Sequence, residues 1–388
     1  MKKTNGFRKL LALVICAMMV IGIVPGLVPE AKADGSTITL GASVLTAGKK
    51  VWFGKTDWRV LKNDGDGKAL LISNDQLDKI QFNPDQNAAN ANVWAGSRAQ
   101  AWCTNYYNAW ASGIEKNAIL ATSKEEKNDY QNLGQYNQNT YGPASLINEY
   151  LFFLSVEEAN TLFNNDGDRK LSSVQPCWWL RSPDKGNNYT VGFVYNDGSI
   201  ASASVDNEIS ARPAFNLNLN AVLFTSETSS DYELTLVDSS LTITPGTMKR
   251  ENNSLTIPVT VSSGCNYASL LITNKKDSWD DNSGWNSGAT MQYYQTAAVS
   301  GTTSTVTFTL PSNYEANREN WKVWLLAEQV NPGTGYASKL KEIAVPYQLK
   351  YDANGGTGTM DSVTVFENDT FRFPECKFGA PEGMAFDH

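Results

Sequence analysis

Two hydrophobic periods alternate along residues 34–222, which indicates that this part of the chain combines strands with helices. Apolar runs flank the Asp/Gly-rich cluster Asn63–Gly67, and a second pair of runs flanks Asn196-Asp197-Gly198. Apolar alternation on both sides of such a cluster is typical of a β-hairpin. We therefore predict one hairpin around each cluster.

The helical period falls in two segments of the same unit. One segment follows Ser97, and its aromatic residues lie near helical spacing at Trp102, Tyr106 and Trp110. The other follows Ser155, and Glu158 stands three positions later, which is the spacing of a capping box. These signals predict one helix that begins after Ser97 and another that begins after Ser155.

Residues 223–347 carry strand-like patterns without a competing helical period. The apolar runs are short and fairly evenly spaced, at Leu234–Val237, Leu255–Val261, Ala268–Thr273, Val306–Leu310, Trp321–Ala327 and Ile343–Tyr347. Such spacing predicts an Ig-like β-sandwich. The Ser/Thr-rich stretch Thr225–Ser230 predicts a linker at its border. Pro258 lies inside one run and predicts an edge strand or a bulge.

The first 33 residues have the layout of a secretory signal peptide. Basic residues precede the apolar run Leu10–Val24, and Ala31-Lys32-Ala33 forms an A-x-A cleavage site. The run is shorter than the roughly 20 residues of a membrane-spanning helix. We therefore predict that residues 1–33 are removed on export, with an uncleaved N-terminal anchor as the alternative. The remaining chain has no transmembrane candidate, so the expected location is secreted or extracellular.

Charge and composition exclude several kinds of chemistry. The chain of 388 residues has 40 acidic and 32 basic residues, and its formal net charge of −8 argues against a nucleic-acid binder. Its one histidine is His388, which leaves no histidine for a catalytic triad or a multi-histidine metal site in the core. Nucleotide-binding glycine motifs are missing. We expect no catalytic residue, metal ion or cofactor, although paired carboxylates stay open.

Two Asp/Asn/Gly clusters resemble calcium loops only superficially. Asn63–Gly67 and Asn164–Asp168 supply oxygen atoms, but in both the carboxylate of the first loop position and the glutamate of the twelfth are missing. Tight turns explain both clusters better.

Four cysteines follow the predicted cleavage site, and an exported protein can keep disulfides. Cys103 and Cys177 fall in the same predicted unit, so they form the candidate disulfide. The alternative is two free, buried thiols, which pack as small hydrophobic groups.

One pair of motifs is specific enough to indicate a family. Trp178–Pro183 reads W-W-L-R-S-P, and Ala211–Leu217 reads A-R-P-A-F-N-L. This pair resembles the hallmark of a secreted bacterial domain, the domain of unknown function 6273. The resemblance implies a C-type-lectin-like or sulfatase-modifying-factor-like α+β fold for residues 34–222, with a twisted antiparallel sheet and two helices. It implies no catalytic residue, because fold-level analogy does not carry an activity.

The motif residues have two readings. In the structural one, the tryptophans fill a core and the arginines pin the last strands. In the functional one, a surface beside the polar loop 184–189 contacts a glycan or a peptide. The candidate ligand-binding residues are Trp179, Arg181, Asn188, Tyr189 and Arg212. Adjacent residues of a strand face opposite sides, so one tryptophan could be core while the other lines a surface.

Residues 348–388 resemble a third kind of module. Tyr351–Thr357, Met360–Val365 and Pro381–Asp387 are similar to the internalin-B-type (Listeria–Bacteroides) repeat, a small β-grasp-like module of surface proteins. The repeat is expected to be partial, and any attachment to the cell surface is expected in a part of the protein beyond it.

The sequence therefore predicts an α+β and all-β multidomain protein. The function we expect is non-catalytic binding or adhesion at the bacterial surface, with a glycan or a protein as the partner. The alternatives are a structural spacer of a larger surface protein and a carboxylate-dependent, glycan-active enzyme. An acid pair in a deep cleft would favour the enzyme, and an aromatic platform without one would favour binding. The oligomeric state stays open.

Overall fold

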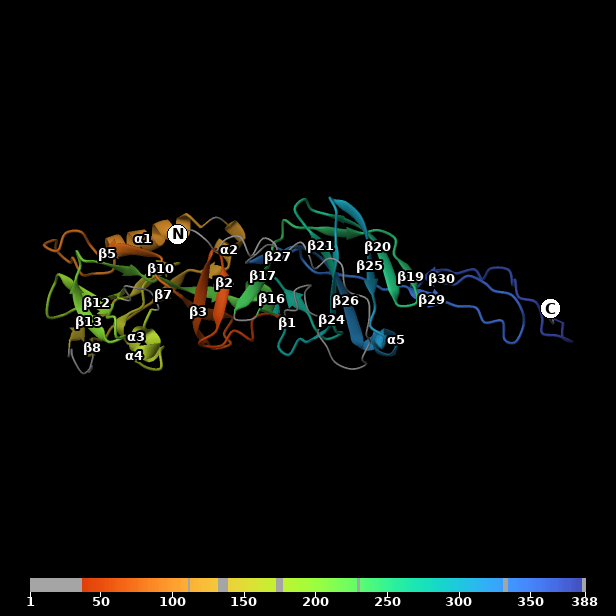
Figure 1. Ribbon diagram of the computed structural model, residues 1–388, viewed down its shortest axis with the longest axis horizontal. Coiled ribbons are helices and arrows are strands. Elements are labelled where there is room, and N and C mark those ends of the chain that lie inside the picture. The colour runs from red at the N-terminus through yellow and green to blue at the C-terminus, as the bar shows by residue number, and fades with distance from the viewer. Residues whose placement is uncertain are drawn as a thin grey trace, which may run out of the picture.

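The computed structural model describes residues 37–110, 112–131, 139–171, 177–228, 231–330 and 334–385. The predicted signal peptide, residues 1–33, lies outside these residues. The protein is β-rich, with several sheets arranged along one elongated body and an arm at the C-terminal end (Figure 1).

In the structure, the first unit comprises residues 37–237 and the second unit begins at residue 238. The first unit contains most of the helices and many short strands. The elements are β1 (Thr37–Leu40), β2 (Lys50–Phe53), β3 (Thr56–Asn63), β4 (Lys68–Ser73), β5 (Asp78–Gln81), α1 (Arg98–Asn108), α2 (Gly113–Asn117), β6 (Ile119–Leu120), β7 (Thr122–Lys124), β8 (Tyr130–Gln131), β9 (Thr140–Tyr141), β10 (Leu146–Glu149), α3 (Val156–Thr161), α4 (Asp166–Arg169), β11 (Trp178–Pro183), β12 (Thr190–Val194), β13 (Ile200–Ser204), β14 (Glu208–Ala211), β15 (Ala214–Asn218), η2 (Leu219–Ala221), β16 (Val222–Glu227) and β17 (Tyr232–Val237).

Residues 238–385 are almost entirely strands and turns. The elements are β18 (Ile243–Pro245), β19 (Lys249–Glu251), β20 (Ser254–Val261), β21 (Tyr267–Asn274), β22 (Trp279–Asp280), β23 (Gly284–Trp285), β24 (Met291–Ala298), β25 (Thr303–Thr309), α5 (Tyr314–Asn317), η3 (Arg318–Asn320), β26 (Trp321–Gln329), β27 (Gly335–Ala337), β28 (Lys341–Glu342), β29 (Tyr347–Leu349) and β30 (Val363–Val365). None of the helices within the described residues is long and apolar enough to cross a bilayer.

The local signals of the first unit are confirmed. The Ser97 hydroxyl accepts the Gln100 N–H at 3.0 Å and begins α1. Both bonds of the capping box between Ser155 and Glu158 are present at the start of α3. The strand pairs β3–β4 and β12–β13 form the two predicted hairpins.

A five-stranded sheet holds the W-W-L-R-S-P motif in its middle. Its strand order is β13-β12-β11-β14-β5, so β11 has a neighbour on each side. Every residue of β11 from Trp178 to Ser182 is buried. Both faces of this strand are therefore covered, and the two adjacent tryptophans both lie in the core.

A larger sheet runs through both units. Within the described residues it has 13 strands, and its main path is β24-β21-β26-β27-β17-β2-β3-β4-β15-β6. The three-residue strand β27 pairs antiparallel with β26 and parallel with β17. Since β17 also pairs parallel with β2 at the register Tyr232↔Val51, backbone hydrogen bonds connect the second unit to the first.

Two sheets of the second unit pack around one core. Strands β20 and β25 form one layer with β18 and β19, while β21, β24 and β26 form the other. Their inward residues, which include Leu255, Leu270 and Leu325, are fully buried. This is the layering expected of a sandwich, and its Ig-like topology stays a prediction.

The expectation that Pro258 marks an edge strand or a bulge is wrong. Strand β20 pairs with β25 along one side, opposite Thr305 at Pro258, and with β18 and β19 along the other. Pro258 lies where β18 has ended and β19 has not yet begun, so the missing N–H of proline breaks no ladder bond there. The Gly246 N–H donates to the Pro258 carbonyl at 2.7 Å across this interruption.

The linker predicted over Thr225–Ser230 is also corrected for the residues described. Residues 222–227 form β16, which pairs with β1 and β17, and Thr225 and Ser226 are both 1% exposed. Phe224 of this strand lies in a third core with Tyr294, at a ring-centroid distance of 5.4 Å. The segment is therefore part of the contact between the two units.

The C-terminal residues form an arm on the sandwich (Figure 1). Strands β29 and β30 make a hairpin, and Thr357 and Gly379 form an isolated bridge farther along. The guanidinium of Arg318 lies 3.5 Å from the Tyr347 ring centroid and anchors the start of the arm. The β-grasp-like character of residues 348–388 stays a prediction.

Glu328 is a buried carboxyl group in the layer that joins the two units. It is 0% exposed, and its Oε2 accepts the hydroxyls of Ser269 at 2.6 Å and Tyr294 at 2.5 Å. Its Oε1 has no partner among the described residues. Burial, with the charge of Glu328, raises the pKa of Tyr294 well above its usual value, so the tyrosine stays a donor.

We expect Glu328→Leu to lower the free energy of unfolding by about 2–4 kcal/mol, because two buried hydroxyls lose the carboxylate that accepts from both and keep only the 3.5 Å contact with each other. Glu328→Gln keeps an accepting oxygen at the same place and should cost less than about 1 kcal/mol. Urea unfolding of both variants measures the difference. Equal stability of the two variants would show that these hydrogen bonds contribute nothing.

Candidate ligand-binding pocket

Trp179, one of the candidate ligand-binding residues, lies in the core, where the structural reading of the motif places it. Its side chain is 0% exposed, and its Nε1–H donates to the Ile80 carbonyl at 2.8 Å. Its ring packs against Phe82 and Phe193, at centroid distances of 5.9 and 6.4 Å. No face of the indole is available to a ligand in this conformation.

Arg181 is also fully buried, and it serves as a junction between separate segments. It donates from Nε to the Ala144 carbonyl at 2.7 Å and from Nη1 to the Phe153 carbonyl at 2.7 Å. The same guanidinium forms ion pairs with Glu126 at 2.8 Å and Glu158 at 2.5 Å. This arginine therefore connects β11 to the neighbouring strands and loops. Of the two roles considered for it, structural and ligand-binding, these contacts fit the structural one.

The carboxyl group of Glu158 belongs to the same network. Burial alone would raise its pKa, but the positive charges of Arg181 and Lys124 outweigh burial and lower the pKa of Glu158 to about 2. The Lys124 amine bonds Glu158 Oε1 at 2.7 Å and Glu126 Oε1 at 3.1 Å. Two cations and two anions thus neutralise one another next to the capping box of α3.

Arg212 occupies a second buried place, on the other side of β11. Its Nε donates to the Ser73 carbonyl at 3.0 Å, and its guanidinium lies 4.8 Å from the Trp178 ring centroid. Burial, with the nearby charge of Arg59, lowers the pKa of Arg212 to about 9, so it remains a cation at neutral pH. At 2% exposure it cannot reach a ligand.

Asn188 and Tyr189 are the two predicted site residues that face solvent. They lie in the loop after β11, and Tyr189 is 42% exposed. The loop is held from below, because Asp184 Oδ1 accepts the Gly186 N–H at 2.9 Å and Asn92 Nδ2 donates to the Asn187 carbonyl at 2.9 Å. The structure therefore does not bring the five predicted residues together into one site.

The candidate disulfide is not formed. Cys103 is buried on α1, Cys177 is half-buried just before β11, and both are free thiols. Burial raises the pKa of each thiol, by the larger amount for Cys103. Both pack against the core of the first unit as small hydrophobic groups, which is the alternative that the sequence left open.

The turn interpretation fits the clusters that could have been calcium loops. The Gly65 N–H donates to Asn63 Oδ1 at 3.1 Å within one turn, and Asp168 forms an ion pair with Arg59 at 2.6 Å. Over the described ranges, no group of three or more metal-ligating side chains is placed to hold a metal ion.

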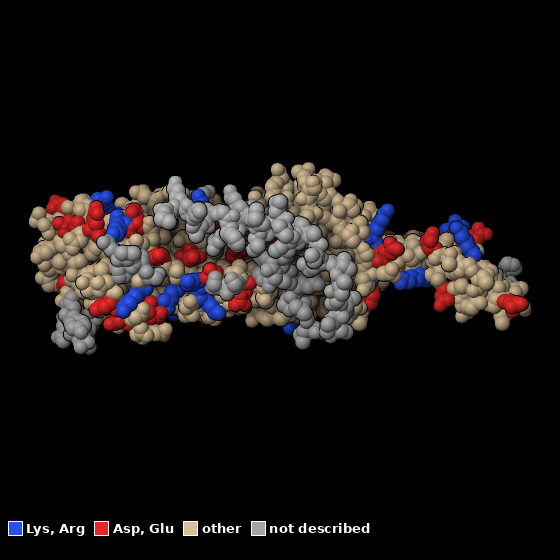
Figure 2. Space-filling model, in the orientation of Figure 1, with Lys and Arg blue, Asp and Glu red and all other residues tan. Residues whose placement is uncertain are grey.

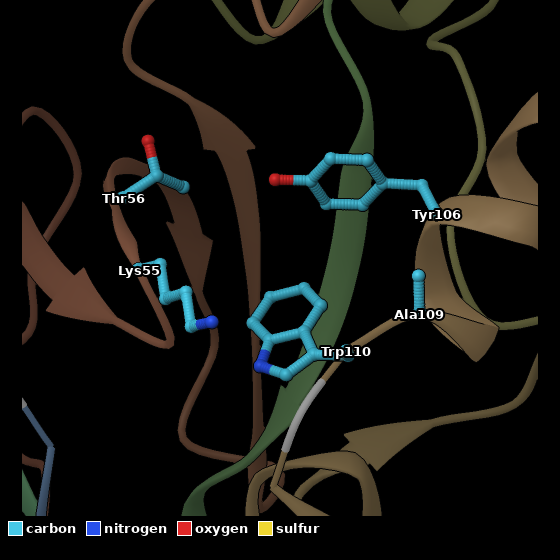
Figure 3. Close-up of a pocket in the computed structure, with 5 residues that line it drawn as sticks. All are labelled: Lys55, Thr56, Tyr106, Ala109 and Trp110. Atoms are coloured by element: carbon cyan, nitrogen blue, oxygen red, sulfur yellow. The ribbon is translucent and has the colours of Figure 1, made fainter.

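A pocket lies where the end of α1 meets the β2–β3 hairpin. It has a volume of about 160 Å³ and is lined by Lys55, Thr56, Tyr106, Ala109 and Trp110. Figure 3 shows the Trp110 indole beside the Lys55 amine and the Tyr106 hydroxyl directed toward Thr56. The pocket therefore combines two aromatic rings with one amine and two hydroxyls, and none of its five lining residues is acidic.

Trp110 forms the aromatic wall of this pocket. Its ring stacks on the buried Trp58 at a centroid distance of 5.8 Å and an interplanar angle of 16°, and it meets Tyr106 edge-on at 6.2 Å. Gly54, at φ +66°, lies against the same indole, where a Cβ would come within 2.3 Å of its ring. Only glycine allows this approach of the hairpin to the tryptophan.

Charges on the visible surface do not form a field that would attract one kind of ion. On the face shown in Figure 2, acidic and basic side chains are interspersed over the first unit and the arm. At the pocket, the one charged group among the five lining residues is Lys55, so recognition there would rest on shape, ring contact and a few polar groups.

The sequence contains a signal for one wall of the pocket, the aromatic one. Trp102, Tyr106 and Trp110 follow one another at intervals of four, and all three are only half-buried in the structure. This row of aromatic side chains runs along α1 and continues beyond its last residue, Asn108. The core covers only part of each ring, so some aromatic surface is left for a ligand. No sequence pattern marks Lys55 and Thr56 as pocket residues. They line the pocket because the turn between β2 and β3 lies beside the end of α1 in the folded protein.

We expect Glu158→Gln to change how stability depends on pH. Since folding lowers the pKa of Glu158 from 4.5 to about 2, its ionised form contributes stability above pH 4.5, and this contribution is lost as pH falls toward 2. Glu158→Gln should therefore be less stable than the wild type by about 3 kcal/mol at pH 7 and by much less at pH 3.

Urea unfolding at both pH values measures this difference. Glu157→Gln is the matched control, because Glu157 is the exposed neighbour on the same turn of α3. A deficit for Glu158→Gln that is the same at pH 7 and pH 3 would contradict the prediction.

Comparison with known proteins identifies one part of the chain. The family model described as Domain of unknown function (DUF6273) matches residues 66–219. No curated protein and no solved structure matches the chain. The match contains Tyr106 and Trp110 of the pocket and ends before the second unit. Residues 66–219 are thus a domain of this family, as the motifs W-W-L-R-S-P and A-R-P-A-F-N-L indicate.

Proposed function

We propose that the protein is a secreted or cell-surface, non-catalytic binding protein of a bacterium, and that its pocket at the end of α1 takes one sugar unit of a glycan. The observation that carries the proposal is the lining of the pocket, with Trp110 and Tyr106 as aromatic walls and Lys55 and Thr56 as polar groups. Signal-peptide layout, acidic charge and a chain of modules support the location.

The size and chemistry of the pocket support a ring-sized ligand. Its volume of about 160 Å³ lies below the roughly 300–1,000 Å³ of sites for drug-sized molecules. A sugar ring has an apolar face that can lie on an aromatic ring and hydroxyls that can bond an amine or a hydroxyl. Few polar groups at defined places on an apolar wall are typical of such sites.

The carboxylate beside the pocket supports binding over hydrolysis. A glycoside hydrolase needs two carboxyl groups about 5–10 Å apart across the bond that it cleaves. Glu115 lies next to Trp110, but its Oε2 accepts the indole N–H at 2.7 Å and its Oε1 accepts the Tyr336 hydroxyl at 3.1 Å. Both of its oxygens are therefore engaged in holding the protein together.

A spacer function has one observation in its favour. The continuous sheet through β27 and β17 gives the elongated body of Figure 1, which would carry a terminal module away from a surface. The protein could act as a spacer and also bind a ligand. If no ligand enters the pocket, only the spacer function remains.

We expect a glycan array to detect binding by the purified protein and Ala109→Arg to weaken it at least tenfold, or about 1.4 kcal/mol. Ala109 is an exposed lining residue, so the arginine fills the pocket without disturbing the core. Asn108→Arg is the matched control, because it adds the same group to the neighbouring exposed position outside the pocket.

A second variant tests the aromatic wall itself. Trp110→Phe keeps a ring in the core contact with Trp58 and reduces the surface offered to the ligand, so it should weaken binding in the same direction. Equal binding by Ala109→Arg and Asn108→Arg would exclude the pocket. Absence of any glycan or peptide ligand would leave the spacer function.

A further inference from the structure

Residues of the second unit reach the wall of the pocket. The Trp110 Nε1–H donates to Glu115 Oε2 at 2.7 Å. The Tyr336 hydroxyl donates to Glu115 Oε1 at 3.1 Å and lies equally close to Ser112 Oγ. A chain of hydrogen bonds thus runs from Tyr336 of β27, through one carboxylate, to the indole that lines the pocket.

A second contact holds the opposite wall. The Gly54 N–H donates to Thr334 Oγ1 at 3.2 Å across 280 residues of sequence. Gly54 lies directly against the Trp110 ring and immediately precedes the lining residues Lys55 and Thr56. Thr334 therefore fixes the hairpin at the point where the hairpin touches the tryptophan.

Tyr336 lies at the interface between the two units, so its position depends on their relative placement. Its ring packs against the core of the first unit and against the core of the sandwich. Its backbone lies in β27, opposite Leu236 of β17 and Gln329 of β26. A displacement between the units would move this strand and the hydroxyl that it carries.

The Tyr336 hydroxyl is protonated near neutral pH. Burial, with the negative charge of Glu115, raises the pKa of Tyr336 to about 12. The hydroxyl therefore keeps its proton. Glu115 is 6% exposed and accepts two donors, one from each unit. A buried carboxylate held in this way loses much when one donor is removed.

We infer that Thr334 and Tyr336 are positioning residues for the pocket, so that ligand binding in the first unit is coupled to the docking of the second. This inference rests on the proposed function for its ligand, but the positions of Trp110 and Gly54 can be tested without one. Because such coupling is reciprocal, a ligand in the pocket would also stabilise the contact between the units.

The test uses the chain from residue 34 to residue 388 with ¹⁵N-labelled tryptophan. The indole N–H resonance of Trp110 is assigned by its loss in Trp110→Phe. Tyr336→Phe, which removes the hydroxyl and keeps the ring, should shift this resonance and speed its exchange with solvent. Thr334→Val should produce a shift in the same resonance, because it releases Gly54 from its acceptor.

Tyr232→Phe is the matched control. Tyr232 lies on the adjacent strand β17, and its hydroxyl donates to Glu227 at 3.2 Å, outside the chain of hydrogen bonds from Tyr336 to Trp110. This variant removes the same group from the same sheet and should leave the Trp110 resonance unchanged. A Trp110 resonance that is the same in the wild type, Tyr336→Phe and Tyr232→Phe would overturn the inference.

The coupling is measured with N-acetylglucosamine as the probe. If the wild type binds it, Tyr336→Phe should weaken binding at least about fivefold, the lower end of allosteric coupling, while Tyr232→Phe should not. Unchanged affinity despite a shifted resonance would refute the coupling. If neither the wild type nor any variant binds this sugar or a glycan on the array, the proposed function fails, and the resonance still decides whether Tyr336 positions the wall.

Discussion

The pairing of β27 with β17 is the constraint on which the arrangement of this molecule depends. Three residues, Gly335–Ala337, supply the backbone hydrogen bonds that continue a sandwich sheet into the sheet of the N-terminal unit. Strand pairing fixes register as well as contact, because a slip of one residue would turn Tyr336 away from the side on which it meets Glu115. The two units are therefore held at a defined offset, which a flexible linker could not provide.

The N-terminal unit is constrained in a different way, because it contains buried charged side chains. Arg181 belongs to the central strand β11, Arg212 packs against Trp178 of the same strand, and both arginines are almost completely removed from water. Arg181 is balanced by two carboxylates, whereas Arg212 relies on carbonyl oxygens and the face of Trp178. Taking such groups out of water is costly unless each donor finds a partner, so the segments that supply the partners must fold around β11 together. The two arginines thus have an architectural role in the fold around β11.

Local chemistry determined what could be predicted from the sequence. The caps at Ser97 and Ser155 and the turns at Asn63–Gly67 and Asn196–Gly198 act over a few residues, and all are found as expected. Predictions that needed the tertiary arrangement stayed open or were wrong. The sequence left Trp179 between core and surface, because it does not show whether the second face of its strand is covered. It assigned Pro258 to an edge strand or a bulge, because it does not show that β18 ends and β19 begins on either side of this residue.

The same argument explains why the pocket could not be found in the sequence. Its walls come from residues 55–56 and 106–110, and its supports come from residues 334 and 336, so no window of sequence contains the site. The family match ends at residue 219, before the second unit supplies Thr334 and Tyr336. Residues outside the matched domain therefore complete the support of the pocket wall, and the binding proposed for this pocket should depend on the module that follows the domain.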